Sequence, residues 1–165
     1  MPVEAKYRAL FVGHQVLAKR ILTSAKIMPA LTDNKNLHNL AVNVNAVWDT
    51  GAMFTCITPS VQDRLKLSPS GKATINGVTG KALVDIVRVA IRLPNDIDIE
   101  FCDVLVADFR VRDVDMLIGM DIISLGDFVV CNMDGQTSFS FAVPPFPDRI
   151  NLAEKAETVN RQNVK

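Results

Sequence analysis

The stretch LAVNVNAVWDTGA, from Leu40 to Ala52, joins a strand pattern to a compact polar turn. Apolar and polar residues alternate from Leu40 to Ala46, and a period of two predicts a strand with one buried face. Val47 and Trp48 are both apolar, so both faces of the predicted strand are apolar at its end. The next residue, Asp49, is therefore expected where little water is present. A carboxylate at the end of such a strand is held by the backbone, and the small residues after it leave room for a substrate chain.

The tetrapeptide Asp49-Thr50-Gly51-Ala52 has two interpretations. It can be an ordinary turn that ends a strand, because Asp and Gly are common turn residues. It can also be a catalytic loop built around the carboxylate. An exact match would arise by chance in roughly 0.3% of chains of this length. The tetrapeptide alone therefore does not distinguish a catalytic loop from an ordinary turn, and the flanking sequence is needed to do so.

A short helix is predicted soon after the turn. Thr58 is a candidate N-cap, and Pro59 suits the first helical position. The apolar residues Val61, Leu65 and Leu67 would then lie on a helix that ends near Ser68-Pro69.

A second motif, DMLIGMDIISLG, runs from Asp115 to Gly126. Large apolar residues lead into Gly119, which indicates a short buried strand that includes Leu117 and Ile118. The apolar residues that follow predict one or two helical turns, with Gly126 as the C-terminal cap.

With these two motifs in this order, the chain resembles the retropepsin-like aspartic proteases, a single-lobe family that includes the retroviral enzymes and many bacterial relatives. The resemblance covers roughly Leu40 to Phe141. It implies a mainly β fold, a closed β-barrel-like acid protease lobe with one or two short helices. It also implies that Leu117-Ile118-Gly119 lies beneath the Asp-Thr-Gly loop.

The chain departs from the viral pattern beside both motifs. Met53 and Phe54 stand where retroviral enzymes tend to carry acidic residues, and Met120 stands where they often carry arginine. The viral ion-pair network is therefore not expected here, and viral substrate preferences do not transfer. These departures favour a bacterial or other non-viral member of the family.

Two hairpins are predicted downstream of the loop. Strand-like segments meet at a glycine-tipped turn, and by resemblance this hairpin is the flap that closes over bound peptide, although an ordinary surface hairpin fits the same residues. The flap candidates are Asn76, Gly77, Val78, Thr79 and Gly80. A final hairpin would turn at Asn132–Gly135, where Asp-Gly is a strong two-residue turn signal.

The chain ends on each side of the protease-like region are treated as separate segments. Residues 1–39 are expected to form strands at Tyr7–Val12, Val16–Ile21 and Ile27–Leu31 followed by a loop, and the retroviral pattern makes them candidates for dimer contacts. Residues 40–143 form the predicted protease domain. Residues 144–165 begin with a proline-rich stop and continue as a frayed helix or disordered tail.

The number of motifs is as informative as their presence. Peptide hydrolysis by this chemistry needs two carboxyl groups around a water, one ionised and one protonated, and two such groups held close together share a proton. The chain has one Asp-Thr-Gly and is about one domain long. An active enzyme must then be a homodimer that uses Asp49 twice. By resemblance, Thr50 hydrogen-bonds across the two-fold axis, while Gly51 and Ala52 support the loop and line the cleft.

Composition excludes several other classes. The net charge is zero, and no basic patch with interleaved aromatics suggests nucleic acid. No run approaches a membrane span, and Glu4 interrupts the start, so neither a membrane segment nor a signal peptide is expected. A cytoplasmic protein without metal or cofactor is the interpretation we adopt.

The three cysteines are candidates for an alternative site. Cys56, Cys102 and Cys131 are widely spaced, with only His14 and His38 to assist them, so a zinc site, a disulfide framework or a Cys-His protease is disfavoured. Reduced and mostly buried thiols are expected. The sequence thus predicts a homodimeric aspartic endopeptidase that cleaves peptide or protein substrates; the alternative is a non-catalytic dimeric peptide-binding module with the same fold.

Overall fold

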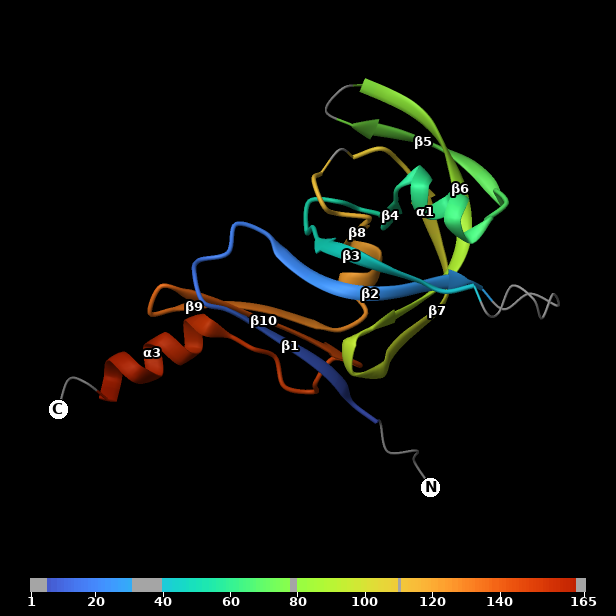
Figure 1. The fold of residues 1–165 in the computed structure, drawn as a ribbon. Helices are drawn as coiled ribbons and strands as arrows, with labels where there is room; N and C mark the ends of the chain where they lie inside the picture. The colour runs from blue at the N-terminus through green and yellow to red at the C-terminus, as the bar shows by residue number, and fades with distance from the viewer. Residues whose placement is uncertain (1–5, 31–39, 78–79, 110, 163–165) are drawn as a thin grey trace.

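The computed structural model describes residues 6–30, 40–77, 80–109 and 111–162 (Figure 1). Within these ranges the chain is mainly β, as predicted, and its helices are short. The strands are β1 (Arg8–His14), β2 (Ile21–Pro29), β3 (Val42–Trp48), β4 (Cys56–Ile57), β5 (Gly71–Gly77), β6 (Gly80–Leu93), β7 (Ile97–Val106), β8 (Met116–Ile118), β9 (Asp127–Met133) and β10 (Gln136–Val143). The helices are α1 (Pro59–Leu65), α2 (Met120–Ile123) and α3 (Leu152–Gln162), with one 3-10 turn at Pro94–Asp96.

Six of the strands close into a barrel. Their order is β2-β3-β8-β4-β7-β6, and an additional pairing of β2 with β6 joins the two ends. β5 extends this sheet as the outer strand of the β5–β6 hairpin. The predicted closed, barrel-like lobe is confirmed. Closure satisfies the backbone groups that an open sheet would leave unpaired.

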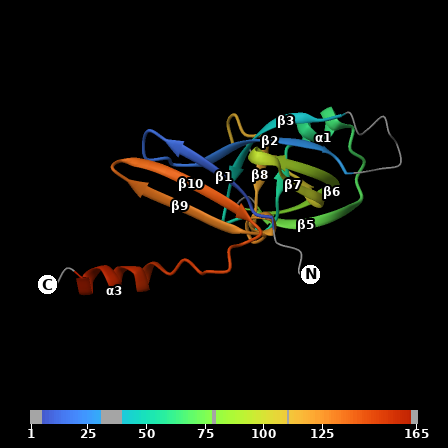
Figure 2. The same ribbon diagram turned by 90° about the horizontal axis from the view of Figure 1, so that it is seen from below.

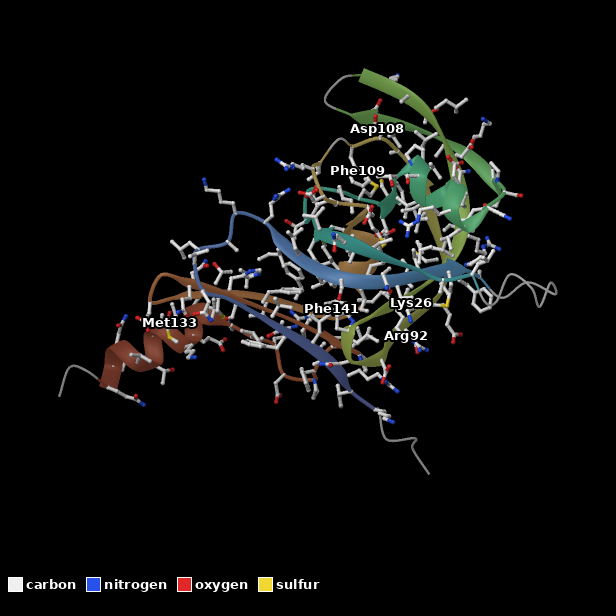
Figure 3. All side chains as sticks on the ribbon, viewed as in Figure 1. Lys26, Arg92, Asp108, Phe109, Met133 and Phe141 are labelled. Carbon is white, nitrogen blue, oxygen red and sulfur yellow. The ribbon has the colours of Figure 1, made fainter. Side chains whose placement is uncertain are left out.

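The remaining strands form a three-stranded antiparallel sheet in the order β1-β10-β9. It packs on the barrel through Trp48, whose ring centroid lies 4.8 Å from that of Phe141, 5.0 Å from Phe139 and 5.7 Å from Phe128. Phe139 and Phe141 are fully buried, and Figure 3 shows Phe141 between the two sheets. Such burial contributes about 1.5–3 kcal/mol for each ring. The residue just before Asp49 therefore anchors the second sheet to the barrel.

The strand predicted before Asp49 is confirmed in β3. Val44 and Ala46 are buried, whereas Asn43 and Asn45 are exposed. The two predicted hairpins are present as well: Gly77 pairs with Gly80, and Met133 pairs with Gln136 around Asp134-Gly135. Asp134 and Gly135 both have positive φ, of 50° and 75°, which is the geometry of a tight two-residue hairpin turn.

The N-terminal strand boundaries were partly wrong. The predicted strand Val16–Ile21 does not form, because Val16 and Leu17 are exposed in the connection between the two sheets. The strand expected at Ile27–Leu31 is instead the second half of β2, which runs unbroken from Ile21 to Pro29. Whether residues 1–39 contact a second subunit stays a prediction.

Two helix ends also differ from the sequence prediction. α1 ends at Leu65, because Lys66 adopts a left-handed conformation, so Leu67 lies outside the helix. Gly126 does not cap α2, whose C-cap is Ser124. Gly126 is instead required by packing, since an added Cβ would collide with the carbonyl group of Ala142.

The C-terminal segment leaves the body of the molecule. β10 ends at Val143, directly before the predicted proline stop. α3 forms as a helix without buried residues, and Figure 2 shows it clear of the two sheets. None of the described helices is long and apolar enough to cross a membrane.

Candidate active site

β3 delivers Asp49 to the end of the barrel. The strand runs parallel to β8, with Trp48 opposite Ile118, and the Asp49 amide continues the ladder by donating to the Ile118 carbonyl at 2.9 Å. Asp49 is half-buried at this point. The predicted segment Leu117-Ile118-Gly119 thus directly supports the residue that carries the carboxylate.

The loop after Asp49 is a tight turn that fixes the carboxylate. The Ala52 amide donates to the Asp49 carbonyl at 3.2 Å, and the Gly51 amide donates to Asp49 Oδ1 at 2.9 Å. A Cβ at position 51 would lie 3.1 Å from Oδ1, so glycine lets this oxygen come close to the backbone. Thr50 is exposed at the tip of the turn. One carboxylate oxygen is oriented by the backbone.

Gly119 lets the two motifs pack against each other. A Cβ at this position would lie 2.6 Å from the carbonyl carbon of Phe54, a distance that no side chain tolerates. The closeness allows the Met120 amide to donate to the Ala52 carbonyl at 2.8 Å, and the Asp121 amide to donate to Met53 at 3.2 Å. The start of α2 is therefore hydrogen-bonded to the loop that follows Asp49.

Asp121 is a structural residue that the sequence prediction missed. Its carboxylate accepts hydrogen bonds from the Thr55 amide at 2.9 Å, the Thr55 hydroxyl at 2.7 Å and the Ile122 amide at 2.9 Å. The fully buried Thr55 hydroxyl in turn accepts from the Gly119 amide at 3.1 Å. An acidic residue in the first turn of a helix is the signal that could have pointed to Asp121.

Asp49 lines a cleft of about 450 Å³. Its lining includes the apolar side chains Val47, Leu117 and Val130, from β3, β8 and β9. It also includes two cations, Lys19 and Arg20, from the β1–β2 connection. Neither cation has an ion-pair partner among the described residues. An extended substrate could therefore meet apolar side chains and positive charge beside the carboxylate.

A family comparison decides what this arrangement belongs to. The model of the family described as "Aspartyl protease" matches residues 36–122, which is more than half of the chain and includes the Asp49 loop and residues 115–122 of the second motif. The chain belongs to the aspartyl protease family. No protein with a curated description gives a significant match.

Several solved structures of this class resemble the chain loosely. A retropepsin-like aspartic protease from Rickettsia conorii is 12% identical, with 84% of this chain and 96% of that chain covered and a TM-score of 0.48. The EIAV protease in complex with an inhibitor is 27% identical, covering 66% and 88%, with a TM-score of 0.47. The simian foamy virus protease is 19% identical, covering 63% and 92%, with a TM-score of 0.40. The family assignment rests on the family match and on the site itself.

The cysteines of this family member do not form a competing nucleophilic site. Burial, followed by the nearby charges of Asp121 and Asp49, raises the pKa of Cys56 to about 11. Burial also raises the pKa of Cys102 to about 12. Both groups stay as thiols at neutral pH, and the thiolate is the reactive form. His14 lies on β1 and His38 lies outside the described residues.

All three cysteines are free, but the expectation that they are mostly buried was wrong. Cys56 and Cys102 are half-buried, and Cys131 is exposed on β9. Within the described ranges, no group of three or more His, Cys, Asp or Glu side chains could hold a metal ion.

The predicted flap residues lie at the end of the β5–β6 hairpin. Asn76 and Gly77 end β5, and Gly80 begins β6 (Figure 1). Val78 and Thr79, which were predicted to form the tip, lie outside the described residues. The hairpin exists, and its role as a flap stays a prediction.

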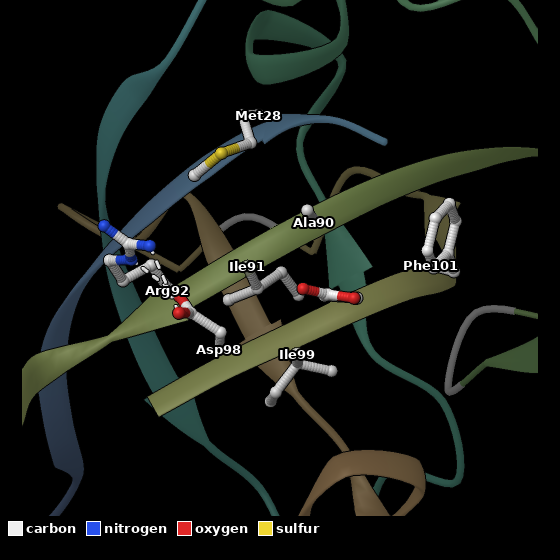
Figure 4. Close-up of a pocket in the computed structure, with 8 residues that line it drawn as sticks. Met28, Ala90, Ile91, Arg92, Asp98, Ile99 and Phe101 are labelled. Atoms are coloured by element: carbon white, nitrogen blue, oxygen red, sulfur yellow. Dashed lines mark hydrogen bonds and ion pairs between the residues drawn. The ribbon is translucent and has the colours of Figure 1, made fainter. Parts of the chain in front are cut away.

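A second hollow lies away from the Asp49 cleft. It measures about 170 Å³ and sits over β2, β6 and β7 (Figure 4). Its floor is apolar, with Ile91 and Ile99, and its rim holds Arg92, which donates two hydrogen bonds to Asp98 at 2.6 and 3.1 Å. Arg92 and Asp98 neutralise each other, Glu100 is a second carboxylate of the lining, and Asp49 does not line this hollow.

Proposed function

We propose that this member of the aspartyl protease family is an endopeptidase that acts as a homodimer, with Asp49 from each subunit in one active site. The observation that carries the proposal is the setting of Asp49: its Oδ1 accepts from the Gly51 amide, and the residue lines an open cleft next to Trp48. Among the described residues, no hydrogen bond is made to Oδ2 of Asp49. Here the second oxygen is left for a water or a substrate.

A single chain supplies half of the required chemistry. The sequence contains one Asp-Thr-Gly, and hydrolysis by this route needs a second carboxyl group. A two-fold axis beside Asp49 supplies it, because a residue that lies next to the axis of a symmetric dimer faces its own copy from the other subunit. Two carboxyl groups that close share one proton, so one is ionised and the other is neutral.

The reaction then follows from these two protonation states. The ionised Asp49 takes a proton from a water, and the water oxygen attacks the scissile carbonyl carbon while the neutral Asp49 donates to the carbonyl oxygen. Collapse of the tetrahedral intermediate breaks the C–N bond, and the amine leaves with a proton from the carboxyl pair. Thr50 braces the two loops across the axis, Gly51 and Ala52 hold the carboxylate, and the β5–β6 hairpin covers the bound peptide.

The test is cleavage of a mixed peptide library by purified protein at mildly acidic pH. Asp49→Asn should lower turnover by at least about a hundredfold, because it removes the general base, while sedimentation shows that the subunits still associate. Asp63→Asn, which changes an exposed carboxylate on α1, is the matched control and should cleave normally. Undiminished cleavage by Asp49→Asn would contradict the proposal. Peptide binding without hydrolysis by the unaltered protein would favour the non-catalytic binding module.

A further inference from the structure

Two cations line the cleft that holds Asp49. Lys19 and Arg20 are exposed side chains of the β1–β2 connection, which joins the three-stranded sheet to the barrel (Figure 1). Among the described residues, neither side chain makes a salt bridge or a hydrogen bond. Asp49 is the only carboxylate among the described residues that line this cleft. Two positive charges therefore stand in the cleft without an acidic partner of their own.

The register of β2 with β3 sets Arg20 close to the candidate catalytic residue. The ladder ends with Ile21 opposite Trp48, and the next residues outward on the two strands are Arg20 and Asp49. Both residues leave the sheet at the same end, and both line the cleft. Both also lie in the described ranges, and no salt bridge joins them. The guanidinium group is therefore available to a group that a substrate brings.

The connection that carries the two cations is held by β10. The buried Thr137 hydroxyl accepts a hydrogen bond from the Ala18 amide at 2.9 Å and donates one to the Asn132 side-chain oxygen at 2.6 Å. The Thr137 amide donates to the Val16 carbonyl at 3.2 Å. The two cations follow Ala18 directly, and β2 begins after them. Their backbone is thus fixed at both ends, which lowers the entropic cost of binding an anion there.

The apolar part of the cleft favours a charge contact at the same place. Val47, Leu117 and Val130 line the cleft together with the cations. A bound peptide displaces water from these side chains, and a lower local dielectric makes a charge pair stronger than it is in bulk water. The planar guanidinium of an arginine also matches the two oxygens of a carboxylate. The cleft therefore fits a peptide that brings both apolar side chains and an acidic one.

We infer that Lys19 and Arg20 form a carboxylate-binding subsite, and that the protein selects peptides with an Asp or Glu side chain close to the scissile bond. The inference rests on the proposed function for the reaction and adds the class of substrate. A two-fold axis beside Asp49 gives each half of the cleft one such subsite, so the acidic residue can precede or follow the scissile bond. A basic side chain at the same place meets two like charges and is rejected.

Matched peptides test the preference directly. A cleaved peptide is resynthesised with Glu, Gln or Lys at each position beside the scissile bond, and kcat/KM is measured at pH 6, where a glutamate with a pKa of about 4.3 is ionised. At the position that reaches the subsite, Glu should be preferred over Gln, which has the same shape without the charge, by about three- to tenfold. Lys should be the poorest of the three. Equal kcat/KM for the three peptides at every position would overturn the inference.

Charge reversal assigns the preference to the two cations. Lys19→Glu combined with Arg20→Glu should invert the order, so that the Lys peptide is cleaved faster than the Glu peptide. Lys26→Glu combined with Lys155→Glu is the matched control, because it changes the net charge equally at two exposed lysines that do not line the cleft. This control should keep the original order. A fall by the same factor with all three peptides in the first variant would mean that the cations act on Asp49 and not on the substrate, and would overturn the inference.

Binding separates this inference from the proposed function. Dissociation constants measured by fluorescence anisotropy with the Asp49→Asn protein need no cleavage. For an apolar peptide that this protein binds, the Glu version should bind about three- to tenfold more tightly than the Gln version. This preference without any cleavage by the unaltered protein would contradict the endopeptidase and leave the subsite intact. Cleavage that is indifferent to Glu, Gln and Lys at every position would overturn the subsite and leave the endopeptidase intact.

Discussion

Thr55 is the residue through which the two motifs hold each other. Its side chain is completely buried, and its hydroxyl both donates to Asp121 at 2.7 Å and accepts from Gly119 at 3.1 Å. Hydrogen bonds of this kind offset the cost of burying a hydroxyl group. The position of the Asp49 loop therefore depends on a side chain six residues away in sequence that does not touch the cleft.

Replacing this hydroxyl by a methyl group should be costly. Thr55→Val keeps the shape but leaves the Gly119 amide without its partner and removes one of the two hydrogen bonds to Asp121 Oδ1, so the free energy of unfolding should fall by about 1–3 kcal/mol. Thr58→Val is the matched control, because the buried Thr58 hydroxyl has no partner among the described residues, and it should change stability by less than about 0.5 kcal/mol or increase it. Denaturant unfolding measures both. Equal losses in the two variants would contradict the role given to Thr55.

The thiols offer a second prediction at the level of single residues. A pKa raised from 9.0 to about 11 lowers the thiolate fraction of Cys56 at pH 8 by about a hundredfold, and Cys102 is shifted in the same direction. Iodoacetamide at pH 8 should therefore modify the exposed Cys131 well before the other two, as mass spectrometry of the peptides can show. Labelling of Cys56 should accelerate as the pH rises toward 11. Rapid labelling of Cys56 at pH 8, accompanied by loss of peptide cleavage, would instead support Cys56 as the catalytic nucleophile.

At the level of elements, the contact between β8, α2 and the Asp49 loop depends on the absence of a side chain at Gly119. Gly119→Ala forces a methyl group into the backbone of Phe54 and should lower the free energy of unfolding by at least about 2 kcal/mol. Peptide cleavage should fall with it, because the Met120–Ala52 hydrogen bond cannot form at its present length. Gly71→Ala is the control: its methyl group would sit 3.6 Å from Ile86, an ordinary contact. Thermal unfolding that shifts equally in both variants would argue against this packing.

Elements with a local signal could be predicted from the sequence, and those with a distant cause could not. β3 shows clear alternation, and the Asp134-Gly135 turn has a local sequence signature. The sequence pattern did not predict β2 as one continuous strand, because two of its buried positions hold Thr23, which is polar, and Ala25, which is small. Thr23 is buried because its hydroxyl accepts from the Trp48 indole at 3.0 Å. That partner lies on the neighbouring strand, so the pattern of β2 alone does not reveal it.

At the level of the whole molecule, the motifs of the candidate site have a local sequence signal, whereas the arrangement of the elements around them does not. Asp49 and Gly119 could be recognised because each sits in a short motif. The pairing of β1 with β10 joins the two ends of the chain, and no local pattern specifies it. The cations at the cleft are placed there by the β1–β2 connection, which runs between the two sheets. These features follow from closure of the barrel and the docking of the second sheet, which are properties of the complete fold.

The last prediction concerns the number of carboxylates in one molecule. If each active site takes Asp49 from two chains, Asp49→Asn subunits that exchange with unaltered ones convert active dimers into dimers with a single carboxylate. With a ninefold excess of Asp49→Asn, activity per unaltered chain should fall to about one tenth. The control is an equal excess of Asp63→Asn, which keeps Asp49 and should leave the activity per chain unchanged. The contrary outcome is activity that the excess of Asp49→Asn does not change, at concentrations where sedimentation shows that subunits exchange. One chain would then suffice for cleavage, and the inference from a single Asp-Thr-Gly to a shared active site would be wrong.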